Sequence, residues 1–296
     1  MVARAGHKLV RQLKDNSFDE DRLESYSLLI QTGSSDLQIA VVDSKNAKVL
    51  LLEDHVFPDV KNDEEVLSAT KDLFFSHHLL QAGFWKDITV GVKTSRFVQI
   101  PKNLFLEESA GEYLAFNARP QAQPEKVLFS EGYRSDAVTV FAIPSGIHEL
   151  FSGYYLRKPC RFVHQASALI AGSLSCAWDG APALYLFVDR FRIHITCLEE
   201  GRLRFYNQFA IKQFQDYVRY IMVVMDDLGL DQSSCRVNLW GYVSKTSPHY
   251  QEFSRYIGNV SLGGRPGGIR FAAGLEDIQD HQFFDLFSLL LTGEQP

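Results

Sequence analysis

The chain has 296 residues, a formal net charge of −6 and 46% hydrophobic residues, enough for one large domain or two of ordinary size. Lys and Arg are interspersed with Asp and Glu, without the basic block that nucleic-acid and anionic-membrane surfaces concentrate, so we expect no nucleic-acid partner. No apolar run approaches the roughly 18 to 20 residues that cross a bilayer, so we expect a protein that is not membrane-embedded.

Residues 1–24 are polar and lack the apolar core of a signal peptide, so we interpret them as a frayed N-terminal segment. Four cysteines are widely spaced in apolar surroundings and form no CxxC pair: Cys160, Cys176, Cys197 and Cys235. Buried free thiols in a reducing compartment are the simplest reading, so we expect a cytoplasmic location and no cysteine metal site.

The first half begins with three consecutive predicted strands, followed by a helix and a returning strand. The strands cover residues 27–33, 36–44 and 48–57, and alternation or apolar runs support each of them. The predicted helix covers residues 64–80 and carries one apolar stripe: Val66, Ala69, Leu73, His77 and Leu80. Residues 87–92 form the returning strand.

Residues 94–144 have no counterpart in the second half and are predicted to form a small inserted subdomain. The predicted order is a strand at 95–100, a helix at 107–118, a Pro-rich turn at 118–126, and strands at 126–132 and 136–143. A helix, a strand and a small-residue helix then lead to residue 173.

The second half repeats the order of the first. Strands are predicted at 183–189, 191–199 and 202–209, a helix at 212–230, a strand at 235–241, a short helix from Pro248, and a last helix at 279–291. A shared order without clear residue identity is what an old duplication of a β-β-β-α-β-α unit leaves. We therefore divide the α/β chain into residues 25–180 and 181–296.

Two such halves, with an insertion in the first, resemble the actin-like ATPase superfamily, which has a duplicated ribonuclease-H-like fold. The layout from Ser95 to Ser173 is similar to that of the actin-like proteins of type IV pilus and type II secretion assembly. The chain also looks like an uncharacterised Bacteroidetes family, a domain of unknown function with this fold. The resemblance covers roughly residues 25–292 and is one of layout, which carries fold better than activity.

The superfamily's phosphate motif is altered in both halves. Its first hairpin carries Asp-x-Gly, whose acid organises Mg²⁺ and whose turn holds phosphate. Here the triplet is Gln31-Thr32-Gly33, followed by Ser34 and Ser35, so the turn remains while the acid is lost. The second hairpin reads Asp189-Arg190-Phe191, in which Phe191 replaces the glycine that lets a backbone approach phosphate.

The superfamily's adenosine loop is a hydrophobic strand that runs into a Gly-Gly turn. Here Gly241 is followed by Tyr242, which narrows the space for a nucleoside. The Gly-rich loop at residues 261–271 includes Gly264 and Arg265 but lacks the GK[ST] ending of a P-loop. Two readings stay open for this loop: a tight connection, or a ligand contact through Arg265.

Three other groups of residues have weaker functional readings. Asp43, Glu53 and Asp189 suggest a ribonuclease-H-type carboxylate cluster, but the first two are predicted at strand ends, where charges are usually solvated. The histidines at positions 77, 78 and 164 are read as packed or surface side chains, because no acid or Cys lies at ligand spacing beside them. The doublet at residues 226–227 ends a helix and is read as a solvated face.

These features predict a non-catalytic binding module or scaffold with no catalytic residue, no metal site and no cofactor. The alternative is a protein that binds Mg-ATP and hydrolyses it slowly, through Thr32, Gly33, Ser34, Ser35, Asp189, Arg190, Gly241, Gly264 and Arg265. The pilus-type relatives hold a short peptide of a membrane-anchored partner beside the insertion, so the resemblance implies a protein or peptide partner. The strands within 96–106 and 127–141 are the candidate surface, unless they pair with each other.

Overall fold

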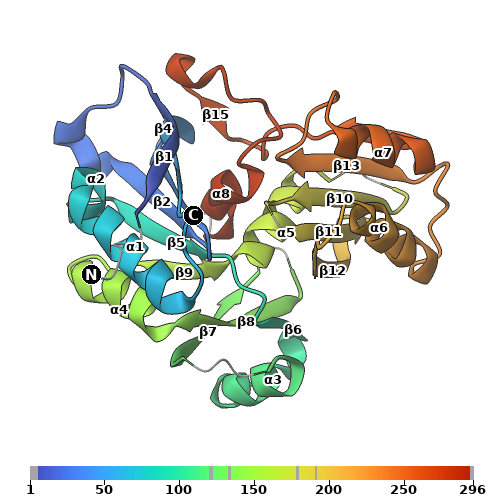
Figure 1. The fold of residues 1–296 in the computed structure, drawn as a ribbon, viewed down its shortest axis with the longest axis horizontal. Helices are drawn as coiled ribbons and strands as arrows, with labels where there is room; N and C mark the ends of the chain where they lie inside the picture. The colour runs from blue at the N-terminus through green and yellow to red at the C-terminus, as the bar shows by residue number, and fades with distance from the viewer. Residues whose placement is uncertain (1–5, 120–122, 133–134, 178–179, 191, 294–296) are drawn as a thin grey trace. The chain divides into compact units, whose positions relative to one another are not determined.

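The computed structural model describes residues 6–119, 123–132, 135–177, 180–190 and 192–293, and the chain forms two compact units (Figure 1). The first unit contains residues 1–168, 268–277 and 289–296, and the second contains residues 169–267 and 278–288. The division therefore falls inside helix α5 (Gln165–Ser175), earlier than the boundary at residue 180 that we placed from the sequence. Within the described residues, no helix has both the length and the apolar character needed to cross a membrane.

A seven-stranded mixed sheet is the centre of the first unit. Six strands lie side by side in the order β1 (Lys8–Lys14), β4 (Lys48–Val56), β3 (Asp36–Asp43), β2 (Tyr26–Thr32), β5 (Asp87–Val92) and β9 (Arg161–His164), and β15 (Arg270–Phe271) pairs with β4. The predicted antiparallel meander β2-β3-β4 is confirmed, and β5 runs parallel to β2. Both β2 and β3 are buried along almost their whole length, because helices and loops cover the two faces.

Residues 8–14 of the N-terminal segment form strand β1, which corrects our reading of this part of the segment as frayed. Strand β1 pairs antiparallel with β4 at the edge of the sheet, and a short 3-10 helix, η1 (Glu20–Ser25), follows it. Its sequence is polar because one edge of the strand and much of its surface face solvent. Two hydrogen bonds of Asp15 secure the end of β1: its amide donates to the carbonyl of Leu50, and its side-chain carboxylate accepts from the amide of Gly274.

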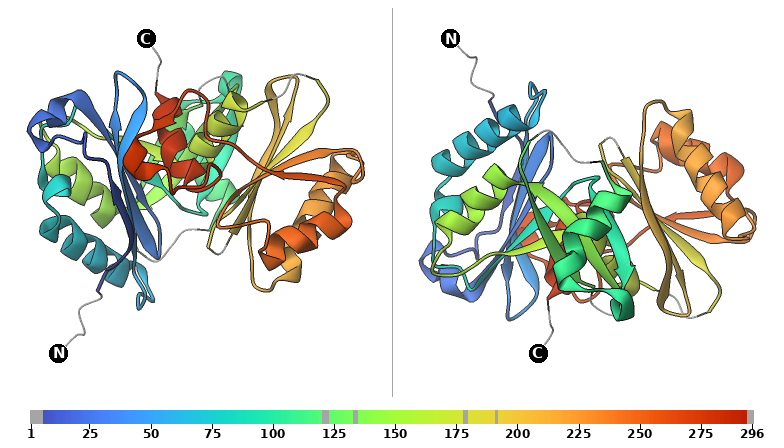
Figure 2. Two further views of the ribbon diagram at one scale, coloured as in Figure 1. Left: turned by 90° about the horizontal axis from the view of Figure 1, so that it is seen from above. Right: turned by 90° about the horizontal axis from the view of Figure 1, so that it is seen from below.

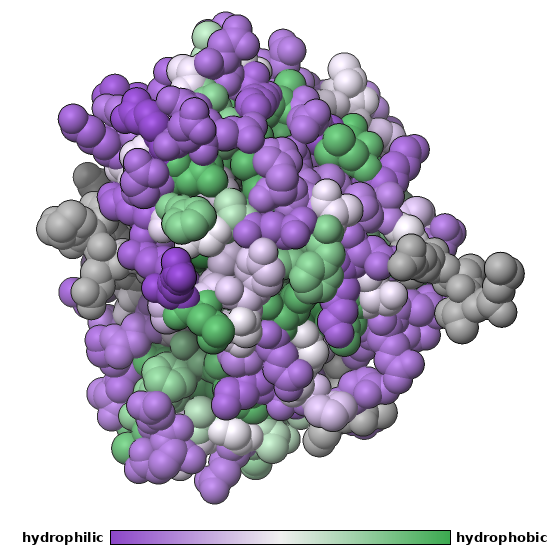
Figure 3. All heavy atoms as spheres, turned by 90° about the vertical axis from the view of Figure 1, so that its left-hand side faces the viewer, coloured by the Kyte–Doolittle hydropathy of each residue, from purple (hydrophilic) through white to green (hydrophobic). Residues whose placement is uncertain are grey.

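Helices α1 (Asp63–Ser76), α2 (His78–Gln81) and α4 (Ser145–Tyr154) lie on one face of this sheet (Figure 2). Asn62 caps α1, since its side chain accepts a hydrogen bond from the amide of Glu65. The single helix that we predicted over 64–80 is wrong, because the chain turns at His77, which has an extended backbone and begins α2. The outer face at the left of Figure 1 shows hydrophobic side chains interspersed with hydrophilic ones (Figure 3).

The predicted insertion forms a three-stranded antiparallel sheet in the order β6 (Phe97–Pro101), β8 (Ala137–Pro144) and β7 (Glu125–Glu131). Two short 3-10 helices, η2 (Lys102–Leu104) and η3 (Glu107–Ser109), lead into helix α3 (Ala110–Asn117). Ala110 and Leu114 of α3 pack on Val140 and Ala142 of β8, which gives the insertion a small core of its own. Part of the predicted Pro-rich turn, residues 120–122, lies outside the described residues.

The second unit repeats the order of the first around a five-stranded sheet. Its strands lie in the order β12 (Arg202–Ala210), β11 (Arg192–Glu199), β10 (Ala183–Val188), β13 (Arg236–Gly241) and β14 (Asn259–Leu262). Helices α6 (Gln215–Asp227) and α7 (Pro248–Tyr256) pack Ile221, Met225 and Phe253 onto this sheet. The duplicated ribonuclease-H-like architecture predicted from the sequence is therefore present.

The C-terminal region differs from the single helix that we predicted over 279–291. A five-residue helix, α8 (Phe284–Ser288), is followed by the 3-10 helix η5 (Leu289–Thr292), and η4 (Ala273–Leu275) precedes them. Phe283 has a positive φ of 53°, which is unfavourable for a bulky residue and prevents the helix from starting earlier. The chain returns to the first unit at Leu289, whose side chain lies against Gly91 of β5.

Candidate functional site

The β2–β3 turn, which corresponds to the superfamily's first phosphate turn, satisfies its own main chain. The amide of Gly33 donates to the carbonyl of Asp36 at 2.9 Å, and the carbonyl of Ser35 accepts from Phe57 at 2.8 Å. Thr32 is buried at the end of β2, while Ser34 is exposed at the tip. Since the Gly33 amide is already bonded, the turn has fewer free donors for a phosphate than the sequence pattern implied.

A buried ion pair lies beside this turn. Lys93, which follows β5, places its Nζ 2.9 Å from Oδ2 of Asp36, and the two side chains are 5% and 4% exposed. A Cβ on Gly33 would lie 2.6 Å from Asp36 Oδ1 and 3.2 Å from Lys93 Cδ, so the pair packs directly against the glycine. The glycine is required here by the protein's own side chains, without any ligand.

Gln31, which replaces the magnesium-organising acid, is completely buried in the sheet. It lies opposite Gln38 on β3 and Gly91 on β5. A neutral amide in this buried position avoids the cost of an unpaired carboxylate but is a poor ligand for a hard cation.

In the second unit, Asp189 and Arg190 form a turn after β10. The Asp189 amide donates to the carbonyl of Arg192 at 2.9 Å, and the Arg190 amide donates to Asp189 Oδ1 at 2.7 Å. The Arg190 guanidinium stacks over the ring of Tyr242, 4.8 Å from its centroid, and donates to the Tyr242 hydroxyl at 3.3 Å. This contact adds cation–π attraction to the hydrogen bond. Phe191 lies outside the described residues, so our reading of its effect stays a prediction.

Gly241 packs against the end of β10, and the 261–271 loop packs against the end of β13. Gly241 has a φ of +100°, and a Cβ there would collide with the Val188 carbonyl, so this position requires glycine. The Trp240 indole donates to the carbonyl of Gly264 at 2.7 Å, and Arg265 forms a 2.6 Å ion pair with Asp280. These contacts favour the reading of the loop as a tight connection.

The carboxylate cluster that we considered from the sequence is not assembled from strand ends. Asp43 does end β3, where it accepts hydrogen bonds from Lys45 and Asn46 and closes its own turn. Glu53 lies inside β4 and is 2% exposed, so our placement of it at a solvated strand end is wrong. His164 is a packed histidine, as expected: its Nε2 bonds the carbonyl of Thr94, and its ring stacks on Phe97.

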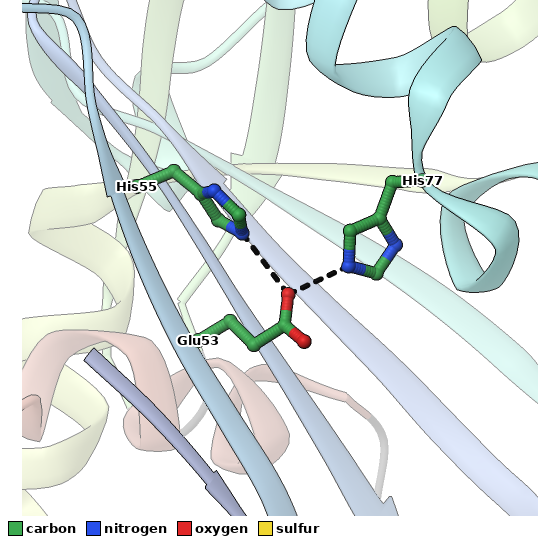
Figure 4. A group of neighbouring side chains, drawn as sticks. All are labelled: Glu53, His55 and His77. Carbon is green, nitrogen blue, oxygen red and sulfur yellow. Dashed lines mark hydrogen bonds and ion pairs between the residues drawn. The ribbon is translucent and has the colours of Figure 1, made fainter. Parts of the chain in front are cut away.

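Glu53 is the centre of a buried cluster with two histidines (Figure 4). Its Oε2 lies 3.0 Å from Nε2 of His55 and 2.6 Å from Nε2 of His77. Its Oε1 accepts a 2.9 Å hydrogen bond from Gln12, the residue directly opposite on β1. Side-chain exposure is 3% for Glu53, 4% for His55 and 12% for His77.

The local fold explains this convergence. Glu53 and His55 are two apart on β4 and therefore point to the same face of the sheet, toward α1 and α2. His77 enters from the break between these helices, and its Nδ1 accepts a long, 3.4 Å contact from the amide of Leu80. Burial acts to raise the pKa of Glu53, but the hydrogen bonds from His55, His77 and Gln12, together with the charge of His77, hold that pKa far below its usual range.

Sequence analysis did not identify this cluster, because His55 was not singled out and His77 was placed within a helix. The Glu-x-His spacing in a predicted strand was the available signal, since it puts both side chains on one face. The contribution of the helix break could not be read from that spacing.

The family DUF3822, described as a protein of unknown function, matches residues 15–260. The chain belongs to this family. The match includes strands β2 to β13, the insertion and the three residues Glu53, His55 and His77, and it leaves out β1 and β15. No protein with a curated description matches this DUF3822 chain.

Solved structures confirm the actin-like fold of this DUF3822 member. A Bacteroides thetaiotaomicron protein with an actin-like ATPase fold and unknown function is similar, with 21% identity, a TM-score of 0.76, and coverage of 93% of this chain and 99% of that one. A chain of the PilM–PilN type IV pilus biogenesis complex has 15% identity, a TM-score of 0.56, and coverage of 91% and 99%. At these identities, the likeness establishes the fold alone.

Proposed function

We propose that the protein is a non-catalytic binding module that keeps the actin-like fold and has lost the nucleotide chemistry of the superfamily. The observation that carries this proposal is the Lys93–Asp36 pair beside Gly33. The pair and the bonded Gly33 amide complete the phosphate turn internally, and Gln31 offers no charge to a hydrated Mg²⁺. Slow ATP hydrolysis is the competing function.

A thermal-shift titration with Mg-ATP separates these two functions. A ligand that binds only the folded state stabilises it by RT ln(1 + [L]/Kd), so about 2.7 kcal/mol is expected at a concentration of 100 Kd. We expect no shift with Mg-ATP at millimolar concentration. A saturable shift that disappears in Asp189→Ala would instead support the nucleotide-binding function and overturn our proposal.

A protein partner that docks on the inserted subdomain is the second part of the proposal. Its strands β6 and β7 pair with β8 between them, as one of our two readings expected, and we place the docking site on the surface around α3. Phe116, Leu104 and Leu106 are 92%, 63% and 55% exposed. The Tyr113 hydroxyl donates to the carbonyl of Leu104 and accepts from the amide of Leu106, which holds this loop beside the helix that carries Phe116. An exposed apolar patch is typical of protein contact sites, and these three exposed side chains come from one short stretch of the insertion.

The fold neighbour from the PilM–PilN complex is itself part of a protein complex, which supports the proposal that this chain also has a protein partner. The four cysteines are free, which supports a cytoplasmic location as part of the same proposal.

Site-specific photocrosslinking in the native host tests the docking surface. A photoreactive residue at position 116 should yield a discrete adduct, and the same residue at Phe84, which is 68% exposed on another part of the first unit, is the matched control. The same adducts from both positions, or none from position 116, would contradict docking on α3.

A further inference from the structure

We propose that Glu53, His55 and His77 form a binding site for one divalent transition-metal ion, with Zn²⁺ as the probe. One carboxylate oxygen and two imidazole nitrogens lie within 4.8 Å of one another in the first unit. This donor set suits zinc and its neighbours in the first transition row, whereas Ca²⁺ and Mg²⁺ prefer all-oxygen sites. The site is independent of the nucleotide motifs and of the proposed docking surface.

The distances require only small side-chain movements to hold an ion. Tetrahedral zinc with bonds of about 2.1 Å separates its ligand atoms by roughly 3.4 Å. The two nitrogens are now 3.0 and 2.6 Å from Glu53 Oε2 and are at most 4.8 Å from each other. Rotation of the three side chains can lengthen the two oxygen–nitrogen distances and adjust the nitrogen–nitrogen distance to this separation.

Charge balance gives a separate reason for a cation at this position. Glu53 is almost fully buried, and its described partners are two imidazoles and one amide rather than a lysine or arginine. A buried carboxylate needs a compensating positive charge, and a divalent cation held between Glu53 and the two imidazoles would supply it.

Gln12 orients the Glu53 carboxylate. It holds Oε1 of Glu53, which leaves Oε2 as a single ligand atom aimed at both histidines.

Metal binding would break one contact of His77. The amide of Leu80 contacts His77 Nδ1 at 3.4 Å, the longest contact in the cluster. This contact must open when His77 binds a metal through Nε2 and carries its proton on Nδ1. His7 lies with its ring 5.6 Å from that of His55, and its buried Nδ1 has no hydrogen-bond partner, but His7 is not among the three residues whose ligand atoms lie within 4.8 Å of one another.

The first measurement uses the wild-type full chain after chelator treatment and titrates it with Zn²⁺ and then Co²⁺. We expect one Zn²⁺ per chain, a rise in Tm, and a Co²⁺ absorption spectrum of a tetrahedral nitrogen–oxygen site without sulfur-to-cobalt charge transfer. Sulfur charge transfer would place the ion on cysteines and overturn the assignment. The absence of both a Tm rise and a Co²⁺ spectrum would overturn the proposal.

Variants then locate the ion. His77→Ala should abolish Zn²⁺ binding, and Gln12→Ala should weaken it by about 10- to 100-fold, as is usual for residues that orient a ligand. His78→Ala is the matched control, because His78 stacks on His77 but is 69% exposed and pairs with Glu20. Circular dichroism checks that each variant folds. If His77→Ala does not fold, the Co²⁺ spectrum of the wild-type protein decides whether the ion is bound by nitrogen and oxygen ligands. Full Zn²⁺ affinity in folded His77→Ala would overturn the proposal.

Discussion

The ammonium group of Lys93 and the carboxylate of Asp36 form a 2.9 Å ion pair between residues 57 positions apart, and both side chains are buried. Asp36 begins β3, and Lys93 immediately follows β5, so the pair joins two strands that flank β2. The two charged groups beside the β2–β3 turn therefore face each other.

The first prediction concerns this ion pair. Lys93→Met should lower the free energy of unfolding by about 3–5 kcal/mol, because it removes the lysine charge that balances the buried Asp36 carboxylate. Urea unfolding measures the loss, and Lys45→Met, at an exposed lysine, is the control. The double variant Lys93→Met/Asp36→Leu should recover most of the stability, and a single variant as stable as the wild type would contradict the argument.

The second prediction separates two glycines that sequence analysis grouped as nucleotide-binding candidates. Gly241→Ala should destabilise the protein by more than about 2 kcal/mol, since it combines a positive φ with a collision against the Val188 carbonyl. Gly264→Ala should stay within about 0.5 kcal/mol of the wild type, because a Cβ there meets nothing within 4 Å. Thermal unfolding of both variants measures the two losses of stability. Equal losses would show that the positive φ and the close contact at Gly241 do not make glycine necessary there.

The third prediction is a pH dependence from Asp15. Hydrogen bonds from the Ser17 hydroxyl, the Gly274 amide and the Ser17 amide lower its pKa from 3.8 to about 2. The folded state therefore favours the ionised form, and the stabilisation is complete above pH 3.8 and is lost as the pH falls toward 2. Asp15→Asn should be less stable than the wild type at neutral pH, with a difference that narrows below pH 3.8. Urea unfolding at several pH values measures it, and a constant difference would contradict this role.

The fourth prediction concerns the thiols. Burial raises the pKa of Cys160 and of Cys197 to about 11 and also raises the pKa of Cys176 and Cys235. Because the thiolate is the reactive form, all four should react with Ellman's reagent at pH 8 far more slowly than a free cysteine. Unfolding in urea should restore fast reaction of four thiols per chain. One rapidly reacting thiol in the folded protein would identify a site that burial does not protect.

Local patterns were sufficient to predict the duplicated order of elements. Alternation and apolar runs marked the meander strands, and Pro248 at the first helical position marked the start of α7. Strand β1 was missed because its edge position allows a polar sequence without an apolar face. The break at His77 was missed because an unbroken apolar stripe does not report where tertiary contacts interrupt a helix.

The chemistry of the sites was predictable only where one short motif contained it. Gln31 stands where the superfamily has an acid, at a position defined by its neighbours, so the replacement of that acid was visible in the sequence. The Lys93–Asp36 pair and the contact of His77 with Glu53 each depend on the pairing of distant segments. No local pattern contains that pairing information.

The return of the chain to the first unit has a consequence for its synthesis. Domains generally fold from the N-terminus as they leave the ribosome. Here β4 acquires its β15 partner only after Phe271 has been made, and Gly91 meets Leu289 only near the end of translation. Synthesis therefore begins and ends with segments of the first unit. The pairing of β15 with β4 and the packing of Leu289 on Gly91 can form only after the sheet of the second unit has been synthesised.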